Sequence, residues 1–159
     1  MSASIRTIVI FFVVLGAFFI YRALPFSLQA RRAEFRSSPA GINVNNLRSI
    51  RVALEQYRAK YGSYPKSVGY SGLRSCWGYS GAKWIPGLVP EFMPALPRDP
   101  RGLSRCDSHY LYTSDGSGYK LVAHKPDDFL KVVSYFPEMY DPRRRGFAYG
   151  FWSREWRNK

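Results

Sequence analysis

Reactive residue types are sparse in this 159-residue chain, and its two cysteines and two histidines are the first to consider. Cys76 and Cys106 do not fit a zinc site, which takes four ligands at short intervals. They are either one disulfide or two inert thiols, and a disulfide persists only outside a reducing cytosol. His109 and His124 fall at the start and the end of two predicted strands, where we expect structural roles.

Sequence motifs for catalysis are missing. The chain has no Gly-x-Ser-x-Gly elbow, no P-loop and no dinucleotide-binding fingerprint. Four glutamates in the body are scattered, so they give no carboxylate pair of the kind that cleaves glycosides; they are Glu55, Glu91, Glu138 and Glu155. We therefore expect a protein that is not an enzyme.

The formal net charge is +13 and the sequence pI is near 10.0. A field of this sign attracts anionic lipid, nucleic acid or acidic proteins. Guanidinium and indole groups near the C-terminus can stack on bases or glycans, and the alternative is that these aromatic residues fill a small core or an interface. The candidate anion-binding residues are Arg143, Arg144, Arg145, Trp152, Arg154 and Trp156.

Residues 7–21 carry no charge and are bracketed by Arg6 and Arg22. Although a full span takes about 20 residues, flanking arginines can extend to the headgroups. We predict a transmembrane anchor over residues 1–25. The alternative is a cleaved signal peptide, but no small-x-small site follows, so we expect the helix to be retained.

Two signals disagree on which side of the membrane the body lies. Several arginines follow the apolar segment, and the positive-inside rule would keep them in the cytoplasm. They are Arg22, Arg31, Arg32 and Arg36. A disulfide between Cys76 and Cys106 would instead require an oxidising compartment.

Residues 26–46 form a basic connector, for which a helical start is one alternative, with a breaker cluster at 37–41. Asn43 or Asn45 can cap a helix that ends at Gly62. Arg51 and Glu55 are four residues apart, so their opposite charges can stabilise this helix weakly. Apolar residues recur there at helical spacing and predict a core face. They are Leu47, Ile50, Leu54, Tyr57 and Tyr61.

The rest of the body reads as a long loop followed by a small sheet. Residues 62–100 form the loop, with a short helical turn in 85–96, and a disulfide would fasten it. Residues 109–113 and 119–124 predict a hairpin, with a third strand at 147–152 and irregular structure over 127–145. The fold class is α+β: an amphipathic helix packed on a small antiparallel sheet, in one domain over 47–159.

A family resemblance emerges from several segments in order. They are Pro25 after the apolar run, the helix 47–57, Tyr61-Gly62-Ser63-Tyr64-Pro65, Leu96-Pro97-Arg98-Asp99-Pro100-Arg101-Gly102, Tyr110-x-Tyr112, Asp115-Gly116 and Tyr119-x-Leu121. In this order and spacing they resemble type IV pilins and the major pseudopilin of type II secretion. The resemblance covers Pro25 to His124 and leaves out the tail 147–159.

The resemblance implies a pilin-like fold and a non-enzymatic component of a type II secretion or type IV pilus-related system. Such a protein is a single-pass protein of the bacterial inner membrane with its body in the periplasm, where Cys76 and Cys106 would pair. It contacts membrane lipid and other secretion or pilus subunits, including copies of itself. The alternative is a basic DNA- or anion-binding pilin-like module for DNA uptake or adhesion.

Two family features differ in this sequence. Prepilins carry a glycine before the apolar run and a glutamate inside it. Here no glycine precedes the apolar run and no acidic residue lies before Glu34, so we expect no prepilin-type cleavage. Pseudopilins also hold calcium near the C-terminus, for which Asp127, Asp128 and Asp141 are the candidates. Because the arginines 143–145 would oppose a cation there, we expect no cofactor, with calcium as the alternative.

Overall fold

The structure is a computed structural model that describes residues 30–31, 33–72, 81–101 and 109–159. The chain divides into two compact units, Met1–Ser38 and Pro39–Lys159. The described part of the first unit includes a helical stretch at 33–37. All helices and strands discussed below belong to the second unit.

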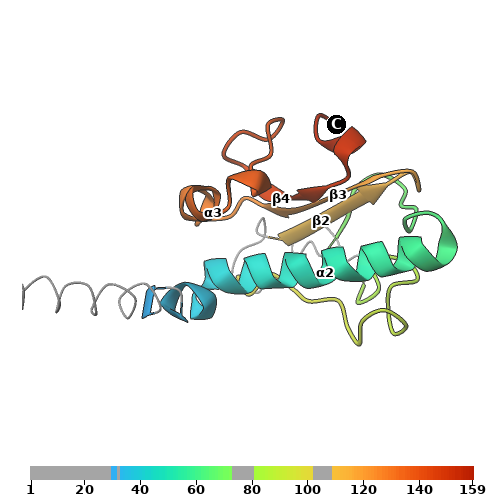
Figure 1. Cartoon of the computed structure of the whole chain (residues 1–159), viewed down its shortest axis with the longest axis horizontal. Helices are drawn as coiled ribbons and strands as arrows, with labels where there is room; N and C mark the ends of the chain where they lie inside the picture. The colour runs from blue at the N-terminus through green and yellow to red at the C-terminus, as the bar shows by residue number, and fades with distance from the viewer. Residues whose placement is uncertain (1–29, 32, 73–80, 102–108) are drawn as a thin grey trace, which may run out of the picture. The chain divides into compact units, whose positions relative to one another are not determined.

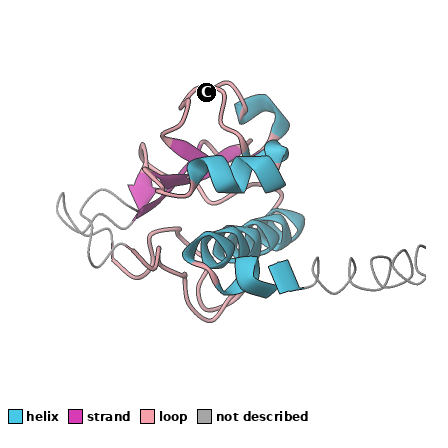
Figure 2. Ribbon diagram, turned by 90° about the vertical axis from the view of Figure 1, so that its left-hand side faces the viewer, coloured by secondary structure: helices cyan, strands magenta, loops and turns pink. Residues whose placement is uncertain are grey.

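The second unit is a four-stranded antiparallel sheet with one long helix along a face (Figure 1). The strands β1 (Ser71–Gly72), β2 (His109–Ser114), β3 (Tyr119–His124) and β4 (Ala148–Trp152) lie in that order. The helix α2 (Pro39–Tyr61) precedes them, α3 (Phe129–Tyr135) and η1 (Pro137–Met139) connect β3 to β4, and η2 (Arg154–Trp156) follows β4. Figure 2 shows loop segments on the side of α2 away from the sheet.

The helix α2 forms because its apolar residues recur every three or four positions and face the sheet. Fully buried positions are Val44, Leu47, Ile50, Ala53 and Leu54. The helix ends where Gly62 takes a φ of 73°, a left-handed conformation that glycine adopts without penalty. The Gly62 N–H bonds to the Arg58 carbonyl at 2.8 Å, which confirms the predicted end of the helix.

The predicted start of this helix is wrong. α2 begins at Pro39, so Asn43 and Asn45 lie inside the helix instead of capping it. A proline in the first turn is tolerated because its missing N–H would have no partner there. The predicted breaker cluster at 37–41 therefore runs into the helix, and Asn43 is buried.

The hairpin is confirmed. β3 has the predicted bounds, and β2 is one residue longer than predicted because Ser114 pairs with Tyr119. In the turn, Asp115 Oδ1 accepts the Ser117 N–H at 2.9 Å and the Gly118 N–H at 3.2 Å. The third predicted strand is β4, which pairs with β3.

Of two predictions about irregular regions, the first is wrong and the second holds for one turn only. Residues 127–145 are not mostly irregular, because α3 and η1 lie there. The helical turn predicted within 85–96 is a series of turns, with a single helix-like bond from the Phe92 N–H to the Leu88 carbonyl at 3.0 Å. Trp84, Ile85 and Leu88 are buried, so packing fastens this part of the loop.

The prediction of the fold class is wrong in one part, because it included a transmembrane helix in addition to the α+β body. Within the residues that the structure describes, no helix is long and apolar enough to cross a membrane. The structure is α+β with a four-stranded antiparallel sheet. The predicted anchor at 1–25, with Arg6 and Arg22, lies outside the described residues, as do Cys76 and Cys106.

Candidate interaction surface

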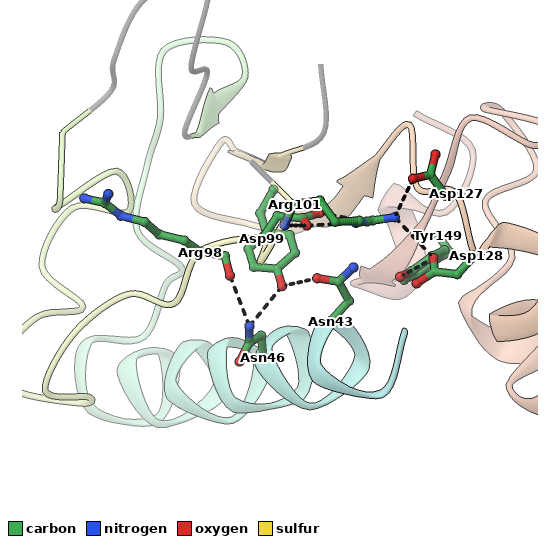
Figure 3. Close-up of polar contacts among 9 residues, drawn as sticks. Asn43, Asn46, Arg98, Asp99, Arg101, Asp127, Asp128 and Tyr149 are labelled. Carbon is green, nitrogen blue, oxygen red and sulfur yellow. Dashed lines mark hydrogen bonds and ion pairs between the residues drawn. The ribbon is translucent and has the colours of Figure 1, made fainter. Parts of the chain in front are cut away.

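A polar cluster joins residues 98–101, at the end of the long loop, to the sheet (Figure 3). Asp99 is buried and grips Arg101 with both oxygens: Oδ1 lies 3.0 Å from Nε and Oδ2 lies 2.9 Å from Nη2. Arg101 Nη1 is 3.8 Å from Asp128 Oδ1, which accepts the Tyr149 hydroxyl at 3.0 Å. Burial is the largest single influence on Arg101 and lowers its pKa, but the Asp99 hydrogen bonds together with the negative charges of Asp99 and Asp128 raise the pKa overall.

The same cluster reaches α2 through Tyr110. Its hydroxyl donates to Asn43 Oδ1 at 2.6 Å and accepts from Asn46 Nδ2 at 3.0 Å. Asn46 Nδ2 also lies 3.2 Å from the Arg98 carbonyl. Burial raises the pKa of Tyr110, so the phenol stays protonated. The cluster thus connects α2, the segment 98–101 and the sheet, and its charges compensate one another inside the fold.

The three candidate calcium ligands face two different basic side chains of this chain. Asp127 and Asp128 both face Arg101 Nη1, the first at 4.0 Å. Asp141 is fully buried against Lys120, whose Nζ is 3.1 Å from both of its oxygens. Among the described residues, no three His, Cys, Asp or Glu side chains lie where they could hold a metal ion.

The buried amine of Lys120 closes the C-terminal part of the fold. Besides Asp141, it donates to the Lys159 carbonyl at 2.6 Å and lies 5.6 Å from the centre of the Trp152 ring. Burial lowers its pKa, since a desolvated ammonium is costly. One internal ion pair therefore holds β3, the loop after η1 and the end of the described chain.

The predicted anion-binding residues fall into two groups. The guanidinium carbon of Arg144 lies 4.5 Å from the Tyr70 ring centre, and its Nη1 lies 3.5 Å from Nδ1 of His124, at the end of β3. Trp156 is buried and packs where a side chain on Gly118 would stand, just before the start of β3. At about 3.3 Å per residue, the two ends of β3 are well separated, so Arg144 lies apart from Trp156. The Arg143 N–H instead bonds at 2.9 Å to Asp141, the partner of Lys120 near the start of β3.

The aromatic members of that set are covered by this chain's own cations. The Lys159 amine lies 4.3 Å from the Trp156 ring centre, and Lys120 approaches Trp152 as described. Arg154 precedes Trp156 in η2 and is exposed. His109 and His124 are cross-strand partners with ring centres 5.2 Å apart.

Sequence reasoning missed the arginines on one flank of α2. The Arg48 guanidinium carbon lies 4.5 Å from the Phe136 ring centre, and that of Arg51 lies 4.8 Å from the Phe151 ring centre. The predicted pairing of Arg51 with Glu55 is not formed, because both Glu55 oxygens accept from the Tyr64 hydroxyl at 3.1 Å. The basic spacing was visible in the sequence, but the aromatic partners come from distant segments.

The other flank of α2 borders a groove of about 530 Å³. Its walls are the helix and the segment 92–97, and the exposed Val52 lies in it. All lining residues are uncharged: Asn46, Ser49, Val52, Ala53, Gln56, Phe92, Met93, Pro94, Ala95 and Pro97. The groove therefore differs from the rest of the chain, whose net charge is +13.

Comparisons with family models, curated proteins and solved structures gave no match for this chain. The resemblance to pilins and pseudopilins therefore stays a prediction based on the residues that carry it.

Proposed function

We propose that this protein is a non-enzymatic, pilin-like subunit of a type II secretion or type IV pilus-related system that works through protein contacts. The uncharged groove beside α2 is the observation that carries the proposal, and its occupant is a neighbouring subunit of that assembly. Like-charged basic proteins repel each other. An uncharged groove lets such subunits approach closely and bury apolar surface.

Contacts within the chain fix the position of one wall of the groove. At its end, Glu91 is paired with Lys60 and accepts the Tyr61 hydroxyl at 2.9 Å. The Tyr57 and Phe92 rings pack with centres 5.4 Å apart. Because these contacts fix the segment after Leu88 against the helix, a partner would meet a preformed surface and lose less entropy on binding.

Photo-crosslinking in the native cell tests the proposal. A photoreactive amino acid replaces Val52 in the groove, and a matched variant carries it at Val68, an exposed valine outside the groove. We expect the Val52 variant to crosslink to identified secretion or pilus subunits, and the Val68 variant to give few such products. Equal products from both sites, or groove products without any such subunit, would refute the proposal.

A further inference from the structure

Arg48 and Arg51 stand three residues apart on α2, so their side chains are neighbours, with Cβ atoms about 5–6 Å apart. Each guanidinium is held over a phenylalanine ring. Such stacking restrains the side chain but leaves the N–H donors at the guanidinium edge unused. Within the described residues, neither guanidinium has a hydrogen bond or a carboxylate partner.

The two phenylalanine rings fix the positions of the Arg48 and Arg51 guanidinium groups. Phe151 lies in β4 and is buried, and Phe136 lies half-buried between α3 and η1. The guanidinium groups are therefore positioned by the body of the fold before any ligand arrives. Pre-positioned groups lose less side-chain entropy on binding, and guanidinium donors match a carboxylate in a two-bond geometry.

We propose that Arg48 and Arg51 form a binding site for aspartate or glutamate side chains of an acidic partner protein. This site is separate from the groove, which borders the other flank of α2. The inference rests on the proposed function in one respect only, namely that the partner is a protein.

The charges next to the site favour an acidic protein over a nucleic acid. Beyond Arg51 the surface carries Glu55, and the fields of Glu55 and Glu155 both act on Arg58. A continuous phosphate backbone following α2 would meet these carboxylates. An acidic protein segment can instead place its own cations there, since protein interfaces use mixed charges to fix register.

The charge of the whole chain also argues against a second copy as the partner. Two molecules of net charge +13 each repel one another at long range. A partner with net negative charge would instead be attracted, and its association would slow as salt is added.

Binding to short labelled probes tests the site on the full chain. The main probe is a fluorescein-labelled peptide of alternating glutamate and alanine, measured by fluorescence anisotropy at low and moderate salt. Its glutamine counterpart and a single-stranded DNA of similar length are the other probes. Arg48→Gln/Arg51→Gln is compared with Lys66→Gln/Lys83→Gln, which loses the same charge from exposed loop positions.

We expect Arg48→Gln/Arg51→Gln to weaken glutamate-peptide binding about tenfold, as loss of charge-assisted bonds would. The loop variant should change it less than about twofold, and the glutamine peptide should not bind. DNA affinity should fall by the same factor in both variants, because non-specific binding follows phosphate neutralisation. Arg48→Lys/Arg51→Lys, which keeps the charge, should bind with intermediate affinity, and melting curves check that every variant is folded.

Three results would overturn the inference. They are no binding of the glutamate peptide to the wild type, equal weakening by both paired variants, and a tenfold loss of DNA binding confined to Arg48→Gln/Arg51→Gln. The last would identify a nucleic-acid site instead. Failure here leaves the groove proposal standing if crosslinks from the Val52 position persist, and Met93→Gln in the groove should not change peptide binding.

Discussion

Arg101 and the pair Arg48 and Arg51 carry the same side chain in different surroundings. Arg101 is gripped by buried Asp99 and faces Asp128, so its charge is compensated inside the fold. The guanidinium groups of Arg48 and Arg51 lie over the faces of phenylalanine rings, form no ion pair with the described residues, and belong to exposed side chains. A net charge of +13 therefore says little about which arginines are available, because some of that charge is neutralised locally.

The two flanks of α2 extend this comparison. One flank carries the exposed guanidinium groups, and the other borders a groove without charge. Between them runs the stripe of residues buried against the sheet. A single helix thus offers two chemically distinct surfaces, and the following predictions test what is buried and what is free.

The largest effect is expected for the buried stripe. Leu54→Asp should lower the free energy of unfolding by about 4 kcal/mol or more, because it places an unpaired carboxylate at a fully buried site. Val52→Asp makes a similar change on the same helix where the side chain is 56% exposed. It should cost less than about 1 kcal/mol. Urea unfolding of the two variants measures the difference, and similar losses would show that the helix is turned differently.

The next effect concerns the buried ion pair. Asp141→Asn should cost about 3 kcal/mol, because it leaves the Lys120 ammonium buried without a counter-charge. Asp115→Asn is the matched control. It makes the same chemical change in an exposed ion pair, in which Asp115 Oδ2 lies 3.6 Å from Lys159 Nζ. A thermal melt compares them, and a control as damaging as Asp141→Asn would argue against an internal role for the pair.

The smallest effect is a pH dependence at the hairpin turn. The hydrogen bond from the Ser117 hydroxyl, with help from backbone N–H groups, lowers the pKa of Asp115 to about 2. Because the unfolded carboxyl titrates higher, near 3.8, the contribution of Asp115 to stability is present above that pH and is lost as the pH falls toward 2. Carboxyl NMR titration measures the pKa, and Ser117→Ala should raise it. An unchanged value in the variant would refute the hydroxyl's role.

The elements with a strong local pattern were predictable. The hairpin follows from alternating strand residues around a turn rich in Asp, Ser and Gly, and Gly62 ends α2 as expected. The start of α2 was not predictable in the same way. Ser37 to Gly41 read as a breaker locally, but packing of Ala40 and Val44 in the core makes helix the better conformation there.

The surfaces were harder to predict than the elements. The set of arginines and tryptophans near the C-terminus was chosen by proximity in sequence, whereas β3 separates Arg144 from Trp156 in space. The stacking of Arg48 on Phe136 joins positions far apart in the chain. Such pairs depend on tertiary packing, which composition and periodicity do not contain.

The central claim is that Arg101 serves the fold whereas the arginines of α2 are left for a partner. Urea unfolding of Arg101→Gln and Arg51→Gln, two identical chemical changes, tests it most directly. We expect Arg101→Gln to cost about 2–3 kcal/mol, because Asp99 loses its buried partner. Arg51→Gln should cost less than about 1 kcal/mol, the size of an exposed cation–π contact. Equal losses, or a larger loss for Arg51→Gln, would show that α2 also uses its arginines for stability and would contradict the claim.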